Sequence, residues 1–238
     1  MDIALAQRYM EKDDPWSSHA IINNWLAGLP SGSCVLDVGT SHGIVGRRFN
    51  QSGFYLKGIE VIPEFAELAR PFYNEHLCVA FDDVPDEFIA FQDVIVLGDV
   101  LEHNPDPARI LNRLIRLQKP ETQIIISVPN VANLWVRINL LFGKFNYSEN
   151  GILDRSHLRF FTKHTFIQLL FNSGLKIVEL KFSPIPLNRV SPFFSKNRVG
   201  RFIHMLLARL TRLLPNLLAY QFVARTKLEQ KVFTHDNC

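Results

Sequence analysis

The sequence predicts an α/β protein whose parallel sheet is covered by helices on both faces. Short apolar runs rich in β-branched residues recur along the chain, helical patterns separate them, and acidic or glycine residues follow several of the runs. Strands alternating with helices form parallel sheets, which bind ligands at the carboxyl ends of their strands. The acidic and glycine positions should therefore meet at one edge of the sheet.

The first strand and the turn after it indicate a nucleotide-like ligand. Cys34 to Val38 form an apolar run typical of a buried strand, and Gly39 and Gly43 bracket a turn where backbone N–H groups can approach a ligand closely. The dinucleotide pattern G-x-G-x-x-G fails because Ser41 stands at its second glycine. A glycine turn after a strand is also common as a tight connection without a ligand, so the later strands must decide between these two interpretations.

The second and third predicted strands also end in acidic residues. Residues 55–60 end in Glu60, and a carboxylate about 20 positions beyond the glycines can accept hydrogen bonds from both hydroxyls of a ribose. The alternative is a solvated strand end. Residues 77–81 lead into Asp82 and Asp83, a pair that would also cap a loop well.

The same alternation continues to the end of the chain. Further strands are predicted over 93–98, 123–130 and 175–182, with a helix over 106–118. Residues 1–32 predict a helical lid in which Ser17 or Ser18 caps the helix. His19 in this lid is either a packing residue or a contact to the ligand.

The chain resembles class I S-adenosylmethionine (SAM)-dependent methyltransferases. The resemblance rests on VLDVGTSHG, DVIVLGDVLEHNPDP, SVPN and HLRFFT, and is closest to the bacterial branch that includes ubiquinone-biosynthesis O-methyltransferases and polysaccharide-pathway methyltransferases. It implies a Rossmann-like, seven-stranded, mostly parallel sheet. The implied organisation is a lid over 1–32, a core over 33–183 with an acceptor-side insertion at 130–161, and residues 184–238 ending in an antiparallel edge strand.

The resemblance also implies SAM as the cofactor and S-adenosylhomocysteine as its product. Asp82 and Asp83 stand where the family contacts adenine, and Glu60 where it contacts ribose. The full implied set of cofactor-binding residues is Asp37, Gly39, Thr40, Ser41, Gly43, Glu60, Val61, Asp82, Asp83, Gly98 and Asp99.

Two histidines are the candidate catalytic residues. His103 follows the fourth strand, where a neutral imidazole could take a proton from an acceptor hydroxyl, and His157 arrives later in LDRSHLRFF. With Asp99 and Glu102 they could instead hold Mg²⁺, as in relatives with an E-x-x-E-H pattern, although Asp99 replaces the first Glu. A structural role is the third interpretation.

Two apolar segments bear on the partners of the protein. In the insertion, VANLWVRINLLFGKF predicts a short amphipathic helix whose apolar residues are expected to pack as part of a lid over the acceptor. Residues 199–214 predict a second helix that is apolar yet carries Arg201, Arg209 and Arg212. This helix either docks beside the sheet or makes peripheral contact with an anionic membrane.

The composition limits the class of protein. A net charge of +3 does not favour nucleic acid as a partner. The three cysteines, Cys34, Cys78 and Cys238, show no paired spacing. This favours a reducing, cytoplasmic location, in which the protein could also contact the inner face of the membrane.

The resulting interpretation is a SAM-dependent methyltransferase that O-methylates a small-molecule, sugar or lipid-linked acceptor. The alternative is a SAM-binding partner or regulator without catalysis, suggested by Ser41 and Asp99. A nicotinamide dehydrogenase is disfavoured by the broken dinucleotide spacing.

Overall fold

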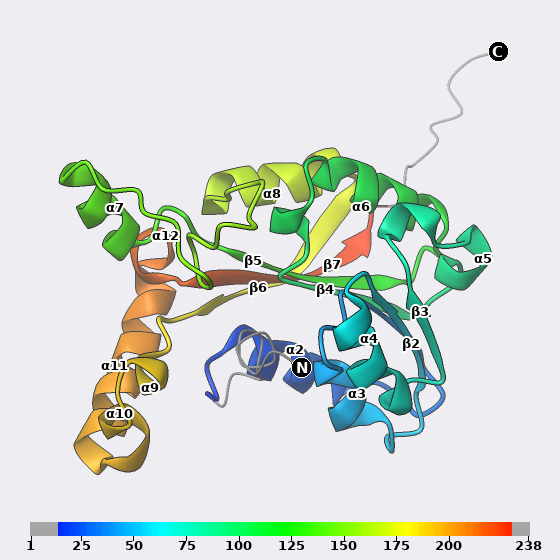
Figure 1. Ribbon diagram of the computed structural model, residues 1–238, viewed down its shortest axis with the longest axis horizontal. Helices are drawn as coiled ribbons and strands as arrows, with labels where there is room; N and C mark the ends of the chain where they lie inside the picture. Colours follow the sequence, from blue (N-terminus) through cyan, green and yellow to red (C-terminus); the bar gives the residue numbers. More distant parts are fainter. Residues whose placement is uncertain (1–13, 230–238) are drawn as a thin grey trace.

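The computed structural model describes residues 14–229, which form one seven-stranded sheet with helices on both faces (Figure 1). The strand order is β3-β2-β1-β4-β5-β7-β6. The strands are β1 Cys34–Val38, β2 Tyr55–Glu60, β3 Glu75–Cys78, β4 Val94–Gly98, β5 Gln123–Pro129, β6 Leu175–Ser183 and β7 Gln221–Leu228. The predicted α/β class and Rossmann-like sheet are confirmed.

Strand β7 is the only antiparallel member of this sheet in the described part of the chain. It pairs with β5 on one side and with β6 on the other, so the expected edge position is wrong. Ser183 at the end of β6 is opposite Gln221 at the start of β7. The excursion over residues 184–220 therefore returns the chain to the point where it left the sheet, and β7 fills the gap between β5 and β6.

Helices cover the two faces of the sheet in separate groups (Figure 1). One face carries α5 Asp86–Ile89, α6 Pro107–Arg116 and α8 Lys163–Asn172, and the other carries α2 Ser18–Leu26, α3 Ile44–Phe49 and α4 Pro63–Ala69. Apolar side chains of α5, α6 and α8 form one core cluster with the sheet, and those of α2 and α3 form another. Burial on both faces explains why the central strands are apolar almost throughout.

The helix starts follow their capping residues. The Ser17 side chain accepts a hydrogen bond from the Ala20 N–H and begins α2, as predicted. Asp106 accepts from the Arg109 N–H and begins α6, whose first residue is Pro107. These caps satisfy N–H groups that a helix start leaves without partners.

The remaining helices gather at the end of the molecule where β5 finishes (Figure 1). They are α7 Leu134–Leu141, α9 Leu187–Val190, α10 Phe193–Lys196, α11 Arg198–Leu213 and α12 Pro215–Leu218. Three single-turn 3-10 helices also occur: η1 Arg70–Phe72, η2 Phe81–Asp83 and η3 Leu101–His103. The Asn133 side chain that caps α7 also donates to the Ala219 carbonyl, so α7 and the end of α12 are joined directly.

The expected packing of the α7 apolar residues is wrong. Val136 is buried, whereas Trp135 is 56% exposed, and Leu141 and Phe142 are more exposed still. The reason is that α7 projects beyond the sheet (Figure 1), and its buried Val136 packs against Ile152 and Leu153 of the insertion and not against a strand. Within residues 14–229 no helix is long and apolar enough to cross a membrane.

Candidate functional site

A cavity of about 400 Å³ lies at the carboxyl ends of the parallel strands. Gly39 follows β1, Glu60 ends β2, Asp99 follows β4 and Pro129 ends β5, and all four line the cavity. Its volume falls within the range of small-molecule sites. The predicted meeting at one edge of the sheet is therefore confirmed for Gly39, Glu60 and Asp99.

The turn after β1 is built from left-handed residues. Gly39 and Gly43 have φ values of 76° and 87°, and Ser41 between them has φ 48°. A Cβ on Gly39 would lie 2.7 Å from Cγ2 of Val100, so that position requires glycine. Ser41 adopts the conformation that a middle glycine would adopt with less strain, and the turn keeps its shape.

Glu60 joins this turn to the second strand. Its carboxylate accepts hydrogen bonds from the Ser41 N–H at 2.7 Å and the Ile62 N–H at 3.0 Å. Glu60 is 6% exposed, and burial raises its pKa, while the N–H donors oppose that shift. Each carboxylate oxygen has a second lone pair for a ligand hydroxyl, which fits the predicted ribose contact.

Asp37 and Thr40 lie behind the turn, not in the main cavity. They line a second space of about 40 Å³ together with His19. Tyr73 donates its hydroxyl to Asp37 at 2.5 Å, and burial raises the pKa of Asp37 to about 7. His19 lines both spaces, so the helix that carries it closes one side of the site.

Asp82 and Asp83 are not among the residues that line the cavity. Strand β3 ends at Cys78, earlier than the sequence predicts, and both carboxylates belong to η2. Asp82 forms an ion pair with Arg109 at 2.5 Å near the surface. Their predicted adenine contact has no support in this geometry. Val61 and Gly98, by contrast, line the cavity as expected.

Asp99 lines the cavity and is held by two neighbouring strands. Its carboxylate accepts a hydrogen bond from the Ser127 hydroxyl at 2.6 Å and another from the Gln221 side chain. Asp99 also has a left-handed φ of 58°, which directs it across the ends of β5 and β7. These contacts turn Asp99 away from a role in a shared metal site with the histidines.

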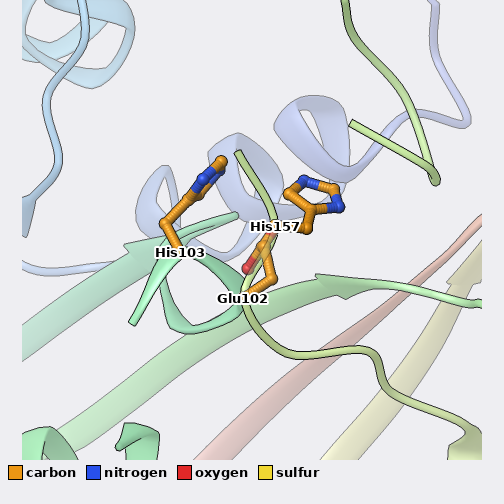
Figure 2. A group of neighbouring side chains, drawn as sticks. All are labelled: Glu102, His103 and His157. Atoms are coloured by element: carbon orange, nitrogen blue, oxygen red, sulfur yellow. The ribbon is translucent and has the colours of Figure 1, made fainter. Parts of the chain in front are cut away.

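Glu102, His103 and His157 form a compact group beside the cavity (Figure 2). One nitrogen of each imidazole and one carboxylate oxygen lie within 4.8 Å of one another. The imidazole rings are 4.9 Å apart and nearly perpendicular. Only His103 of this group lines the cavity, and Glu102 is 1% exposed behind it. The two histidines meet, as the sequence predicts, but His157 is a neighbour of His103 and not part of the cavity wall.

Backbone carbonyls orient both imidazoles. Nδ1 of His103 is 3.3 Å from the Ser156 carbonyl, and Nδ1 of His157 is 3.1 Å from the Ile152 carbonyl. A carbonyl only accepts, so each Nδ1 is the donor and each Nε2 keeps a free lone pair. Burial and then the nearby His103 lower the pKa of His157.

Residues 13–180 match the family model described as a methyltransferase domain. The chain belongs to this family. With the sheet order and the cavity at the strand ends, this makes it a class I SAM-dependent methyltransferase. SAM and S-adenosylhomocysteine are therefore its implied cofactor and product, and the shaped turn and Glu60 fit the ribose of such a ligand.

Curated relatives of the methyltransferase include a ubiquinone biosynthesis O-methyltransferase of Pseudomonas paraeruginosa. It is 29% identical over 140 residues, which cover 53% of this chain and 60% of the relative. The chain thus spans about 60% of the length of that curated relative.

Solved structures share the fold. A SAM-dependent methyltransferase from Archaeoglobus fulgidus has a TM-score of 0.58 at 18% identity, with 88% of this chain and 92% of that chain covered. The 1,6-didemethyltoxoflavin-N1-methyltransferase of Burkholderia thailandensis has a TM-score of 0.55 at 17% identity, with 89% and 76% covered. These likenesses show the fold alone.

The end of the methyltransferase cavity near His103 is built from two distant segments. The insertion contributes Asn150, Asp154 and Ser156, and the later segment contributes Arg189 and Tyr220. The first three residues belong to the acceptor-side insertion that the resemblance implies over 130–161. Arg189, Tyr220 and Gln221 were not predicted, because no local pattern indicates that β7 inserts next to β5.

Proposed function

We propose that this methyltransferase transfers the methyl group to an oxygen atom, with His103 as the general base. The observation that carries the proposal is that His103 lines the cavity with its Nδ1 at the Ser156 carbonyl, which leaves Nε2 to take a proton. The curated relatives named as O-methyltransferases support oxygen as the acceptor atom.

The protein needs to supply little beyond position and a proton acceptor. SAM, when bound, supplies a methyl group that its sulfonium already activates. Positioning of two reactants contributes about 7 to 11 kcal/mol, and a general base contributes about 3 to 5 kcal/mol. His157 assists by position: its own proton stays on Nδ1 toward Ile152, and its lowered pKa keeps it neutral beside His103.

The proposed acceptor is a small molecule, a sugar or a lipid-linked compound that carries a hydroxyl group. Asn150, Ser156 and Tyr220 offer polar contacts in the cavity, and Arg189 offers a cation for an anionic substituent. Burial raises the pKa of Tyr220 to about 12, so its hydroxyl remains a hydrogen-bond donor at neutral pH. These side chains suit a polar acceptor that carries hydroxyl groups.

The donor set does not support the Mg²⁺ expectation. Mg²⁺ prefers oxygen ligands, and the group offers one carboxylate and two imidazoles because Asp99 is engaged by Ser127 and Gln221. Such a set is more typical of transition metals. In the absence of Mg²⁺, His103 is the imidazole in the cavity wall that we assign to the proton transfer.

The proposal is tested with His103→Asn and His157→Asn, which preserve polarity and size. Methyl transfer from labelled SAM to a panel of catechols and sugars should fall by about 10² to 10⁴-fold in His103→Asn. His157→Asn should lose less of the methyl-transfer rate than His103→Asn does, and its rate should rise at a different pH from that of wild type. Calorimetric titration should give unchanged SAM affinity for both. Full activity in His103→Asn would refute its role as the base.

Treatment with a chelator distinguishes catalysis by a general base from catalysis that needs a metal ion. EDTA should leave the wild-type rate unchanged, and added Mg²⁺ or Mn²⁺ should not raise it. A rate that falls with EDTA and returns with either ion would assign Glu102, His103 and His157 to metal binding instead.

A SAM-binding protein without catalysis is the second candidate. Ser41 was one reason to consider it, but its left-handed backbone preserves the turn. Binding of SAM with no transfer to any acceptor in the panel would favour this candidate, whereas failure to bind SAM would exclude both.

A further inference from the structure

Helix α11 docks on the protein through its small and polar side chains. The buried residues of the helix are Gly200, His204, Ala208 and Thr211, which share one face. A Cβ on Gly200 would lie 2.2 Å from the Phe193 carbonyl oxygen, so close contact with α10 requires glycine. His204 pairs with Asp14 at 3.3 Å, and both side chains are buried.

The opposite face of α11 is apolar and exposed. Phe202 is 59% exposed and Leu213 is 75% exposed, and Val199, Ile203, Leu206 and Leu210 are also exposed. These residues recur every three or four positions and therefore form one stripe along the helix. We call this stripe the outer face of α11. An ordinary surface helix turns its apolar stripe inward, so this arrangement is reversed.

Arginines flank the outer face. Arg198, Arg201, Arg209 and Arg212 lie on one side of it at helical spacing and are exposed. Residues 180–228 contain nine Lys or Arg residues and no Asp or Glu. The net charge of the whole chain is only +3, so positive charge is concentrated in this segment.

An anionic lipid surface complements this combination better than a second copy of the chain. Two copies joined through the outer face would bring their arginine flanks together with no carboxylate in the segment to offset the repulsion. A bilayer accepts apolar side chains below its headgroups and binds arginines at its anionic phosphates. Helix α7, whose exposed apolar side chains include Trp135, lies at the same end of the molecule (Figure 1).

We propose that the outer face of α11 lies in the interface of an anionic lipid bilayer and docks the protein there. The helix lies in the plane of the interface, with Phe202 and Leu206 among the acyl chains and Arg201 and Arg209 at the phosphates. Arg189 and Tyr220, on either side of α11 in the sequence, line the cavity. Docking through α11 does not depend on methyl transfer.

The test is flotation of the full chain with vesicles. One preparation is phosphatidylcholine, and the other contains about one quarter phosphatidylglycerol. Wild type should bind the anionic vesicles, more weakly at high salt. Phe202→Glu with Leu206→Glu should reduce the partition coefficient at least about tenfold, because two buried apolar side chains are lost and two like charges are added.

The matched control is Phe171→Glu with Val178→Glu, which changes charge equally at exposed apolar residues on α8 and β6. This control should bind the anionic vesicles more strongly than Phe202→Glu with Leu206→Glu does. A second variant, Arg201→Gln with Arg209→Gln, keeps the outer face apolar and should bind anionic vesicles less than wild type does. If the glutamate variant does not fold, this second variant tests the membrane contact of α11. SAM titration and thermal melting verify folding of each variant.

Three results would overturn the proposal. Wild type that binds neither vesicle preparation has no such surface. Equal loss in the control and α11 variants makes binding a matter of net charge alone. Self-association in sedimentation that Phe202→Glu with Leu206→Glu abolishes, without vesicle binding, assigns the outer face to a second copy.

Discussion

Asp37 is the buried carboxyl group whose protonation the fold alters most clearly. Burial is the main cause of its raised pKa, and the hydrogen bond from Tyr73 opposes the shift without cancelling it. Its neighbour Glu60 accepts two backbone N–H groups and stays in the cavity wall. Two acidic residues at adjacent strand ends therefore differ in role: Glu60 faces the ligand, and Asp37 braces the turn from behind.

The raised pKa of Asp37 predicts a pH dependence of stability without ligand. Its pKa rises from 3.8 to about 7 on folding, so between these values the folded chain holds a proton that the unfolded chain has lost. Stability from this group should therefore fall as pH rises from about 4 to 7 and then level off. The upper limit is about 4 kcal/mol, at 1.36 kcal/mol per pKa unit. Urea melts across this range measure it.

Asp37→Asn should flatten the pH dependence between these limits, because the amide does not titrate. Asp83→Asn, at an exposed position, is the control and should leave the slope as in wild type. A slope in Asp37→Asn equal to that of wild type would show that another group causes it.

At the scale of elements, the turn between β1 and α3 depends on both conformation and space. Gly43 has φ 87°, and a Cβ there would lie 3.1 Å from Cα of Ala69 and 3.2 Å from the Phe72 ring. Gly32 has almost the same φ, 85°, but no atom lies within 4 Å of its Cβ position. A comparison of substitutions at the two glycines therefore distinguishes the cost of backbone strain from the cost of crowding.

Gly43→Ala should destabilise the protein more than Gly32→Ala. Strain alone costs about 1 to 2 kcal/mol in either variant, and crowding adds about 1 to 3 kcal/mol at position 43. Gly43→Ala should also weaken SAM binding, because the shifted turn no longer places Ser41 against Glu60. Denaturant melts and SAM titration measure both effects. Equal losses in the two variants would exclude crowding as a cause.

The sequence predicted the elements that local patterns determine. The strands ending at Val38, Glu60 and Gly98 were predictable because buried parallel strands are apolar runs, and in this chain each of the three runs stops at a glycine or an acidic residue. The meeting of His103 with His157 followed from their positions after the fourth strand and in the acceptor-side insertion. The positions of Tyr220 and Gln221 were not predictable, because they depend on where β7 pairs, and no local pattern records the neighbours of a strand.

The exposed faces of α7 and α11 could not be predicted for a related reason. Periodicity identifies an apolar stripe but does not tell which side of a helix meets the protein. In α11 the small residues Gly200 and Ala208 allow the closer approach, so the docked face is the less apolar one. Asp82 does not line the cavity because β3 ends at Cys78, before that residue, and its adenine contact stays a prediction.

At the scale of the whole molecule, α11 fastens the segment before α2. The Asp14 carboxylate pairs with His204, and the Arg212 guanidinium lies 5.4 Å from the centre of the Trp16 ring. The Trp25 indole N–H, near the end of α2, donates to Glu179 on β6 at 2.9 Å. The helix that places His19 in the cavity wall is thus held at both ends by late parts of the chain.

The Asp14 and His204 pair should show energetic coupling. Asp14→Ala and His204→Ala should each destabilise the protein by about 1 to 3 kcal/mol, because each leaves a buried polar partner alone. The double variant should lose less than the sum, with an interaction of about 0.5 to 3 kcal/mol. Urea melts of the four proteins give this cycle, and strictly additive losses would mean that the contact is not energetically important.

Strand β6 has one neighbour in the sheet, and that neighbour is β7. During synthesis β6 leaves the ribosome well before β7, so its backbone has no sheet partner until the intervening helices have also been made. The part of the sheet from β3 to β5 can assemble earlier, since the pairings among these strands lie within residues 34–129. Folding should therefore occur in two stages, and the cavity wall that contains Tyr220 and Gln221 is completed in the second.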